Sequence, residues 1–150
     1  MEIFRICKAN YATQLTSSGS INRWNKAGQF VIYAGSSRSL STLELVVHKN
    51  SITSSVNYKV MVISIADDDA LVTQVRLNEL PDNWQKLAAY SVLQNIGSDW
   101  YENQRSLILK VPSAVIPLEY NYVINTEHPD FKTKVSLVRL EPYFWDGRLL

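Results

Sequence analysis

The 150-residue chain is poor in cysteine, glycine and proline, and it carries almost no excess charge. The single cysteine, Cys7, excludes an internal disulfide framework and favours a reducing compartment. We find no repeat, no low-complexity tract and no Pro- or Gly-rich linker. A formal net charge of +1 provides no strong field to attract a nucleic-acid backbone or an anionic membrane. We therefore expect neither direct nucleic-acid binding nor membrane association.

Long hydrophobic runs are also missing. The apolar stretches, such as VMVISIA at 60–66, are far too short to cross a bilayer. The N-terminal segment MEIFRICKANY lacks a long apolar core and a small-residue cleavage site, so no signal peptide is expected. These absences favour a cytoplasmic protein.

What the chain does contain is enough apolar sequence for one domain spanning 1–150. The hydrophobic share is 46% and the charged share 19%, as in ordinary globular proteins. Short segments rich in β-branched and aromatic residues predict strands at 2–6, 30–35, 58–66, 72–77, 106–115, 121–127 and 134–145. Helices are predicted at 36–50 and at 81–96, the second ending at Gly97. The pattern favours an α+β fold with a mainly antiparallel sheet and a few helices.

A long polar loop at 10–25 leads into the second strand. Residues 21–35 read INRWNKAGQFVIYAG, with Arg23 and Trp24 side by side just before an apolar segment. Loop side chains usually face solvent, where a Trp gains little from packing. The loop therefore either folds an anchor back onto the core or carries a binding site.

Glu44 stands among apolar residues of the first predicted helix. Leu40, Leu43 and Val47 recur at helical spacing and predict a buried stripe on which Glu44 falls. A buried carboxylate is unfavourable without a partner. Glu44 is thus either a functional group, a stripe-edge Glu that reaches water, or half of a structural ion pair.

Ser113 is a hydroxyl on an apolar strand face. One face of the predicted strand 106–115 carries Leu107, Leu109, Val111, Ser113 and Val115. A buried hydroxyl needs a hydrogen-bond partner, most often a neighbouring backbone carbonyl. Pro112 removes a ladder donor just before it, so we expect the strand to end there and to open onto a cleft.

Two further strands carry polar groups on apolar faces. Arg5 alternates with Ile3 and Cys7, so it needs a carboxylate, backbone carbonyls or a ligand phosphate, unless it reaches solvent from an edge strand. Tyr33 shares a face with Gly35, which leaves space for a ring or ligand; otherwise Tyr33 is an ordinary core residue. Such a set of side chains suits an anionic, ring-bearing ligand, with Arg on phosphates, Tyr on a base, and Glu and Ser on a ribose.

The chain resembles the RES domain, a family named for an Arg, a Glu and a Ser. The resemblance rests on RWN at 23–25, FVIYAGSSRSLSTLELVVH at 30–48, LPDNW at 80–84, IGSDWY at 96–101, and VPSAVIPLEYNYVIN at 111–125 followed by HP. It extends from EIFRI to the terminal FWDGRLL. One departure is that family members commonly carry two Gly residues before RWN, where this chain has Ile21 and Asn22. The loop backbone is therefore less free to approach a ligand.

RES proteins are toxins of bacterial toxin–antitoxin pairs, with a fold similar to that of ADP-ribosyltransferases, and they break the nicotinamide–ribose bond of NAD. The resemblance places the family Arg on Arg23, its Tyr on Tyr33, its Glu on Glu44 and its Ser on Ser113. Arg5 falls where the transferase-like fold carries a NAD-binding residue on its first strand. Glu44 and Ser113 are thus the implied catalytic residues, and Arg5, Arg23 and Tyr33 the implied substrate-binding residues.

The implied chemistry relies on positioning and charge stabilisation. Glu44 would hold the ribose hydroxyls and stabilise the positive ribose, while Arg5 and Arg23 hold the pyrophosphate and Trp24 fixes the loop. The acceptor would be water, phosphate or a protein side chain. NAD is the substrate, with no further cofactor, and no metal site is expected because His48 and His128 lie far apart in sequence.

The resemblance also implies a partner, an antitoxin of the Xre type that forms a hetero-oligomer with the chain. Two other functions stay open. One is a protein ADP-ribosyltransferase that uses the same pocket. The other is a non-enzymatic binding module in which Glu44 and an Arg form only a structural pair.

Overall fold

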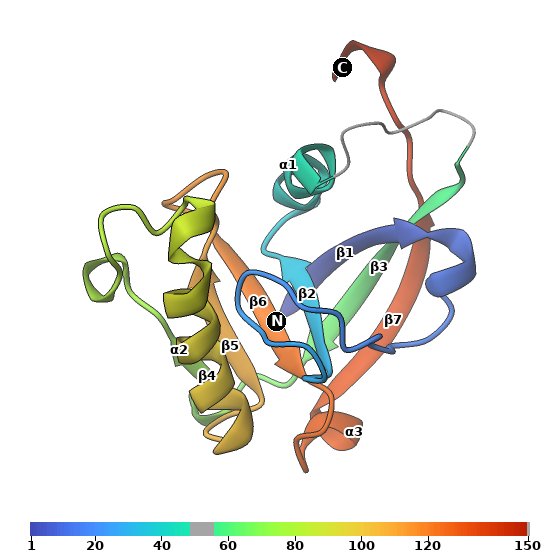
Figure 1. Ribbon diagram of the computed structural model, residues 1–150. Helices are drawn as coiled ribbons and strands as arrows, with labels where there is room; N and C mark the ends of the chain where they lie inside the picture. Colours follow the sequence, from blue (N-terminus) through green and yellow to red (C-terminus); the bar gives the residue numbers. More distant parts are fainter. Residues whose placement is uncertain (49–55, 150) are drawn as a thin grey trace.

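The computed structural model describes residues 1–48 and 56–149, and this part of the chain forms one seven-stranded sheet with three α-helices (Figure 1). The strands are β1 (Glu2–Lys8), β2 (Val31–Gly35), β3 (Tyr58–Ile65), β4 (Val72–Gln74), β5 (Ile108–Pro112), β6 (Tyr120–Asn125) and β7 (Val135–Pro142). The helices are α1 (Arg38–His48), α2 (Tyr90–Glu102) and α3 (Phe131–Lys134). None of the described helices is long and apolar enough to cross a membrane.

The strand order is β4-β5-β6-β2-β1-β3-β7, and every neighbouring pair is antiparallel except the parallel pair β4–β5. This confirms the predicted α+β class with a mainly antiparallel sheet. Each predicted strand is present, with ends that differ from the prediction by at most three residues. Apolar segments bounded by turn residues were therefore a sufficient signal for the strands.

The sheet divides into two halves that meet at β1 and β2. These strands share a single register pair, Phe4 opposite Gly35. By contrast, β2 pairs with β6 over five residues and β1 pairs with β3 over seven. Figure 1 shows β1 and β2 diverging from their point of contact. A sheet that opens between two central strands leaves room for a site at that point.

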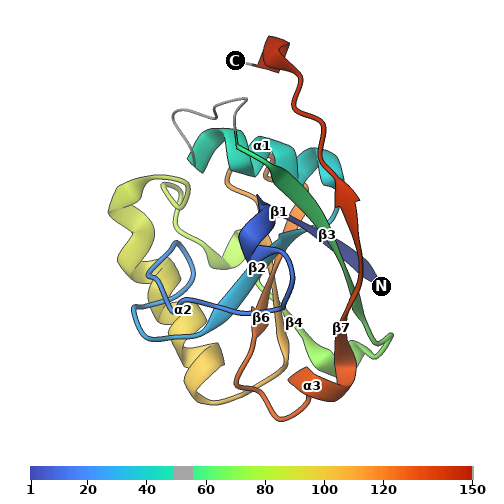
Figure 2. The same ribbon diagram turned by 90° about the vertical axis from the view of Figure 1, so that its right-hand side faces the viewer.

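Three apolar clusters hold the layers together. The largest joins both halves of the sheet through residues such as Ile3, Ile32, Met61, Ile108 and Ile124. A second packs α2 on β2, β5 and β6 through residues such as Trp24, Val31, Leu93, Trp100 and Val123. The third packs α1 on β1 and β3 through Phe4, Ile6, Leu45, Val60 and Val62. Figure 2 shows α1 lying across one end of the sheet, next to β1 and β2.

The face of α1 that is buried differs from the predicted one. Leu43 and Val47 are exposed, at 37% and 59%, and the buried residues of the helix are Leu40, Ser41 and Leu45. The predicted stripe of Leu40, Leu43 and Val47 is therefore wrong except for Leu40. The last two residues of the predicted helix, 49 and 50, lie outside the described part of the chain.

A close contact between Gly35 and Ser41 explains the orientation of α1. A Cβ on Gly35 would lie 2.5 Å from the Ser41 Oγ, so only glycine allows the helix this close to the sheet. The Ser41 hydroxyl then donates to the Phe4 carbonyl at 2.8 Å, which satisfies it inside the core. Apolar spacing alone did not reveal this, because the residue that faces the sheet is polar.

Helix α2 also begins and ends later than the predicted helix at 81–96. Gly97 lies in its middle instead of ending it. A Cβ at Gly97 would stand only 1.7 Å from the Trp24 carbonyl oxygen, so this glycine lets the loop backbone lie directly against the helix. The predicted helix end at Gly97 is wrong, because glycine is found both at helix ends and where another segment packs closely against a helix.

Candidate functional site

A cavity of about 290 Å³ opens where β1 and β2 diverge. Its walls come from β1, β2, α1, the end of β5 and the loop before β2. The structure brings four predicted site residues to this cavity, namely Arg5, Arg23, Tyr33 and Glu44, and places the fifth, Ser113, in contact with Glu44. The volume lies near the lower end of the range for small-molecule sites, about 300–1,000 Å³.

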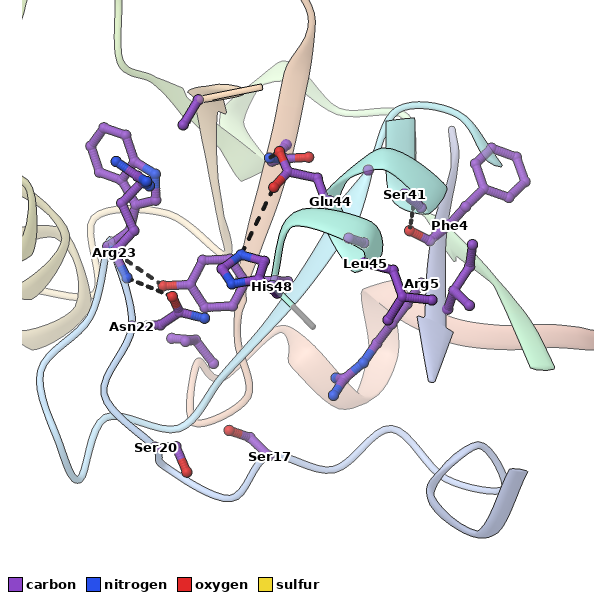
Figure 3. Close-up of a pocket in the computed structure, with 18 of the residues that line it drawn as sticks. Phe4, Arg5, Ser17, Ser20, Asn22, Arg23, Ser41, Glu44, Leu45 and His48 are labelled. Atoms are coloured by element: carbon purple, nitrogen blue, oxygen red, sulfur yellow. Dashed lines mark hydrogen bonds and ion pairs between the residues drawn. The ribbon is translucent and has the colours of Figure 1, made fainter. Parts of the chain in front are cut away.

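The Glu44 carboxylate is held through one of its two oxygens. Its Oε1 accepts hydrogen bonds from the Ser113 Oγ and from the Asn121 Nδ2, both at 2.7 Å. Its Oε2 lies 3.9 Å from the Nε2 of His48, one helical turn further on (Figure 3). Among the described residues, Oε2 accepts no hydrogen bond, so this is the oxygen that a ligand in the cavity would meet.

Ser113 is fully buried, and its hydroxyl is fully occupied. The Ser113 Oγ accepts from the backbone N–H groups of Val115 and Ile116, each at 3.1 Å. A hydroxyl has one donor and two acceptor positions, so its proton is left for Glu44. As predicted, β5 ends at Pro112, and Pro112 lines the cavity. Ser113 itself lies behind the carboxylate.

Arg5 is a cation that has no partner among the described residues. Within residues 1–48 and 56–149 its guanidinium forms no hydrogen bond and no ion pair. Burial lowers the pKa of the Arg5 guanidinium, although an arginine still remains charged at neutral pH. In Figure 3 the side chain points from β1 toward the loop that carries Ser17 and Ser20. A partly buried Arg that no described residue pairs, in a cavity lined by serines, is suited to bind an anion.

Arg23 differs from Arg5 because its guanidinium is already engaged. Its Nη1 donates to the backbone carbonyls of Trp84, at 3.3 Å, and Gln85, at 3.2 Å. Its Cζ lies 4.7 Å from the centre of the Tyr90 ring, a cation–π distance. Arg23 thus ties the loop to the segment before α2 while it also lines the cavity.

Tyr33 fixes the RWN loop through its hydroxyl, which donates to the Asn25 Oδ1 at 2.6 Å and accepts from the Trp24 backbone N–H at 3.1 Å. Burial raises the pKa of the Tyr33 hydroxyl well above its ordinary value, so it stays a donor. Asn25 is buried and donates in turn to the Ser20 carbonyl at 2.9 Å. The ring of Tyr33 lines the cavity, and its hydroxyl holds the loop.

Trp24 shows why the loop carries a Trp beside Arg23. It is 2% exposed and packs in the cluster beneath α2, so the interpretation as an anchor is confirmed. The predicted space beside Gly35 is not free, because Ser41 fills it. A ligand would therefore meet the ring of Tyr33 from another side.

Asn121 and His48 are cavity residues that the sequence analysis missed. Asn121 alternates with the buried Val123 on one face of β6, so the argument used for Ser113 would also have found it. His48 lies four residues after Glu44, on the same face of α1. Both signals were present in the sequence.

Comparisons with known proteins give a consistent result. Residues 2–146 match the RES domain. The chain is 36% identical to a "Prs ADP-ribosylating toxin" of Sphingobium sp., over 85% of this chain and 80% of that protein. It is 33% identical to "Toxin Res" of Yersinia enterocolitica, over 99% of both chains.

A solved structure shows the same fold. A chain of the M. tuberculosis MbcT–MbcA toxin–antitoxin complex superimposes with a TM-score of 0.69 at 16% identity. The match covers 95% of this chain and 81% of that one. It confirms the predicted ADP-ribosyltransferase-like fold.

Proposed function

The chain belongs to the RES domain family, and on that premise we propose that it is the toxin of a toxin–antitoxin pair and cleaves the bond between nicotinamide and ribose in NAD. The observation that carries the proposal is that one cavity holds both a carboxylate and a cation that has no partner among the described residues. Glu44 presents at one wall an oxygen that accepts no hydrogen bond from the described residues, and Arg5 presents at another a guanidinium that none of them pairs. A molecule with a ribose and phosphates satisfies both groups at once.

In the proposed reaction the glycosidic C–N bond breaks and its electron pair goes to the pyridinium nitrogen, so nicotinamide leaves neutral. The ribose carbon becomes cationic. The Oε2 of Glu44 stabilises this charge and holds a ribose hydroxyl, while the ring of Tyr33 packs against the ligand. Charge placed where it develops in the transition state is an effective source of catalysis.

The two arginines have different proposed tasks. Arg5 binds the pyrophosphate, since its donors have no other partner among the residues described. Arg23 keeps the loop at the cavity and offers to the ligand the N–H groups that the carbonyls of Trp84 and Gln85 leave free. Ser113 orients Glu44 and does not touch the substrate in this proposal.

The acceptor of the ADP-ribosyl group is water or phosphate, which makes the protein an NAD glycohydrolase or phosphorylase. With water the products are ADP-ribose, nicotinamide and a proton. A protein side chain is the second candidate, and the name of the Sphingobium relative, an ADP-ribosylating toxin, favours it. Both reactions begin with the same bond cleavage and need the same pocket.

The proposed partner is an antitoxin of the Xre type, which forms a hetero-oligomer with the chain in the cytoplasm. Relatives bear the name toxin, and the superimposed structure is a toxin–antitoxin complex. An acidic or carboxylate-ended segment of the antitoxin would pair with Arg5 and fill the cavity. The antitoxin would supply any DNA binding, since this chain has a formal net charge of only +1.

The test uses purified chain and NAD labelled in its adenylate half, with and without inorganic phosphate. Label in ADP-ribose identifies water as the acceptor, label in a phosphorylated ADP-ribose identifies phosphate, and label on protein identifies a transferase. NAD that stays intact with folded chain under every condition would overturn the proposed function.

A further inference from the structure

We propose that Asn121 is a positioning residue that sets the direction of the Glu44 carboxylate; the inference rests on the proposed function. Asn121 lies in the middle of the sheet, with Gly35 of β2 opposite it on one side and Val111 of β5 on the other. From there its Nδ2 reaches the Oε1 of Glu44 at 2.7 Å. This contact joins β6 to α1 at the wall of the cavity.

Two donors on one oxygen determine how the carboxylate is rotated. The Oε1 of Glu44 receives Asn121 from β6 and Ser113 from the end of β5, so both its acceptor positions are filled. The plane of the carboxylate is then fixed, and Oε2 must point away from the sheet. If only one of the two donors were present, the carboxylate could rotate about its single remaining hydrogen bond.

Of the two donors, only Asn121 can be changed without disturbing the turn that follows β5. Ser113 also accepts from Val115 and Ile116, so its removal affects the backbone after β5. The Asn121 Nδ2 has its hydrogen bond to Glu44 alone among the described residues. A change at this amide therefore acts on the carboxylate first.

The position of α1 makes this contact possible. Gly35 admits Ser41 to within contact of the sheet, and Glu44 follows Ser41 by three residues. Residues three apart lie on neighbouring positions of a helix surface, so Glu44 is placed over the sheet where Asn121 stands. The close approach of α1 at Gly35 thus brings Glu44 within reach of Asn121.

The test is Asn121→Asp, which keeps the shape of the side chain and replaces the donor by an acceptor, together with Asn121→Ala. Both variants should lower kcat for NAD consumption roughly 10- to 100-fold, the loss expected for a misplaced catalytic group. KM for NAD should change less than about threefold, because the charge of Glu44 acts mainly on the cationic ribose of the transition state and the pyrophosphate contact of Arg5 is left in place. A purely structural role would instead lower the melting temperature and reduce binding and turnover together.

The control is Asn95→Asp, which adds the same charge at an exposed position of α2 and should leave kcat unchanged. Each variant is compared with wild type only after its folded state is checked, and either one suffices if the other fails to fold. Unchanged kcat in a folded Asn121 variant overturns the inference. Wild-type chain that leaves NAD intact contradicts the proposed function instead, so the two failures are distinguishable.

Discussion

At the scale of single residues, the site depends on which charged groups already have partners. Arg23 has two carbonyls and an aromatic ring, whereas Arg5 has no hydrogen-bonding partner in the described chain. One oxygen of the Glu44 carboxylate accepts two hydrogen bonds, and the other accepts none from the described residues and lies 3.9 Å from the His48 Nε2. A ligand can still satisfy polar groups that form no hydrogen bond with the described part of the chain, and both of these groups line the same cavity.

Glu44→Gln should abolish NAD consumption while the fold and NAD binding survive. The two side chains have nearly the same shape, but the amide lacks the charge that stabilises a cationic ribose. The measurement is turnover together with NAD affinity by calorimetry, with the exposed Glu127→Gln as the control for a lost carboxylate. A folded Glu44→Gln variant that keeps full turnover would show that the carboxylate is only structural.

Lysine substitutions should distinguish the proposed roles of Arg5 and Arg23. Arg5→Lys keeps the charge but loses the planar fork, so NAD affinity should fall by about 1–3 kcal/mol with little change in stability. Arg23→Lys should also weaken NAD binding, and it should lower the melting temperature, because the bonds to Trp84 and Gln85 are lost. Calorimetry and thermal unfolding measure the two effects. Equal loss of stability in both variants would argue against different tasks.

At the scale of elements, the loop before β2 is held by α2 along its length. The Trp24 carbonyl lies against Gly97, and the side chain of Gln94 donates to the Asn22 carbonyl at 2.8 Å. The side chain of Gln29 donates to the Ser98 Oγ at 2.8 Å. The helix that packs on the sheet thus also fixes the loop that carries Arg23.

Gly97→Ala should therefore damage the site from a distance. The added Cβ would lie 1.7 Å from the Trp24 carbonyl oxygen, so the loop has to move. We expect a loss of at least about 1–3 kcal/mol in the free energy of unfolding, as for overpacked cores, and weaker NAD binding. Denaturant unfolding measures the first effect, with the exposed helical position Asn95→Ala as the control. A stability equal to that of the control would contradict this close contact.

The sequence predicted the strands well and the helix faces poorly, for a physical reason. Apolar runs such as those of β3 and β5 reflect strands buried on both faces of the sheet. Such runs can be recognised without knowing which elements pack against the strand. The face of α1 depends instead on the contact between Gly35 and Ser41, which are brought together only by the fold. The exposed Leu43 and Val47 show that apolar spacing did not determine it.

The sequence predicted which residues form the candidate site, but not which of them contact one another. Glu44 was singled out from a stripe that is largely exposed, yet it does lie at the cavity. Ser113 was expected to be buried, and it is, but its hydroxyl serves Glu44. Which donor meets which acceptor depends on the packing of β5, β6 and α1, and no local pattern contains that information.

At the scale of the whole molecule, a toxin that consumes NAD has to be held inactive in its own cell. If the antitoxin fills the cavity, antitoxin and NAD should compete for the chain. Raising NAD in a titration of the chain with antitoxin should then weaken the apparent affinity of the antitoxin. An affinity that does not depend on NAD, in a complex that still consumes it, would place the inhibition elsewhere.

The central claim is the proposal that NAD binds and is cleaved in the cavity between the two halves of the sheet. The most direct measurement is the release of free nicotinamide from NAD by purified wild-type chain, followed over time by proton NMR. The account predicts that nicotinamide appears in step with the loss of NAD and that Glu44→Gln releases none. Folded wild-type chain that releases no nicotinamide, or a Glu44→Gln variant that releases it at the wild-type rate, would contradict the account.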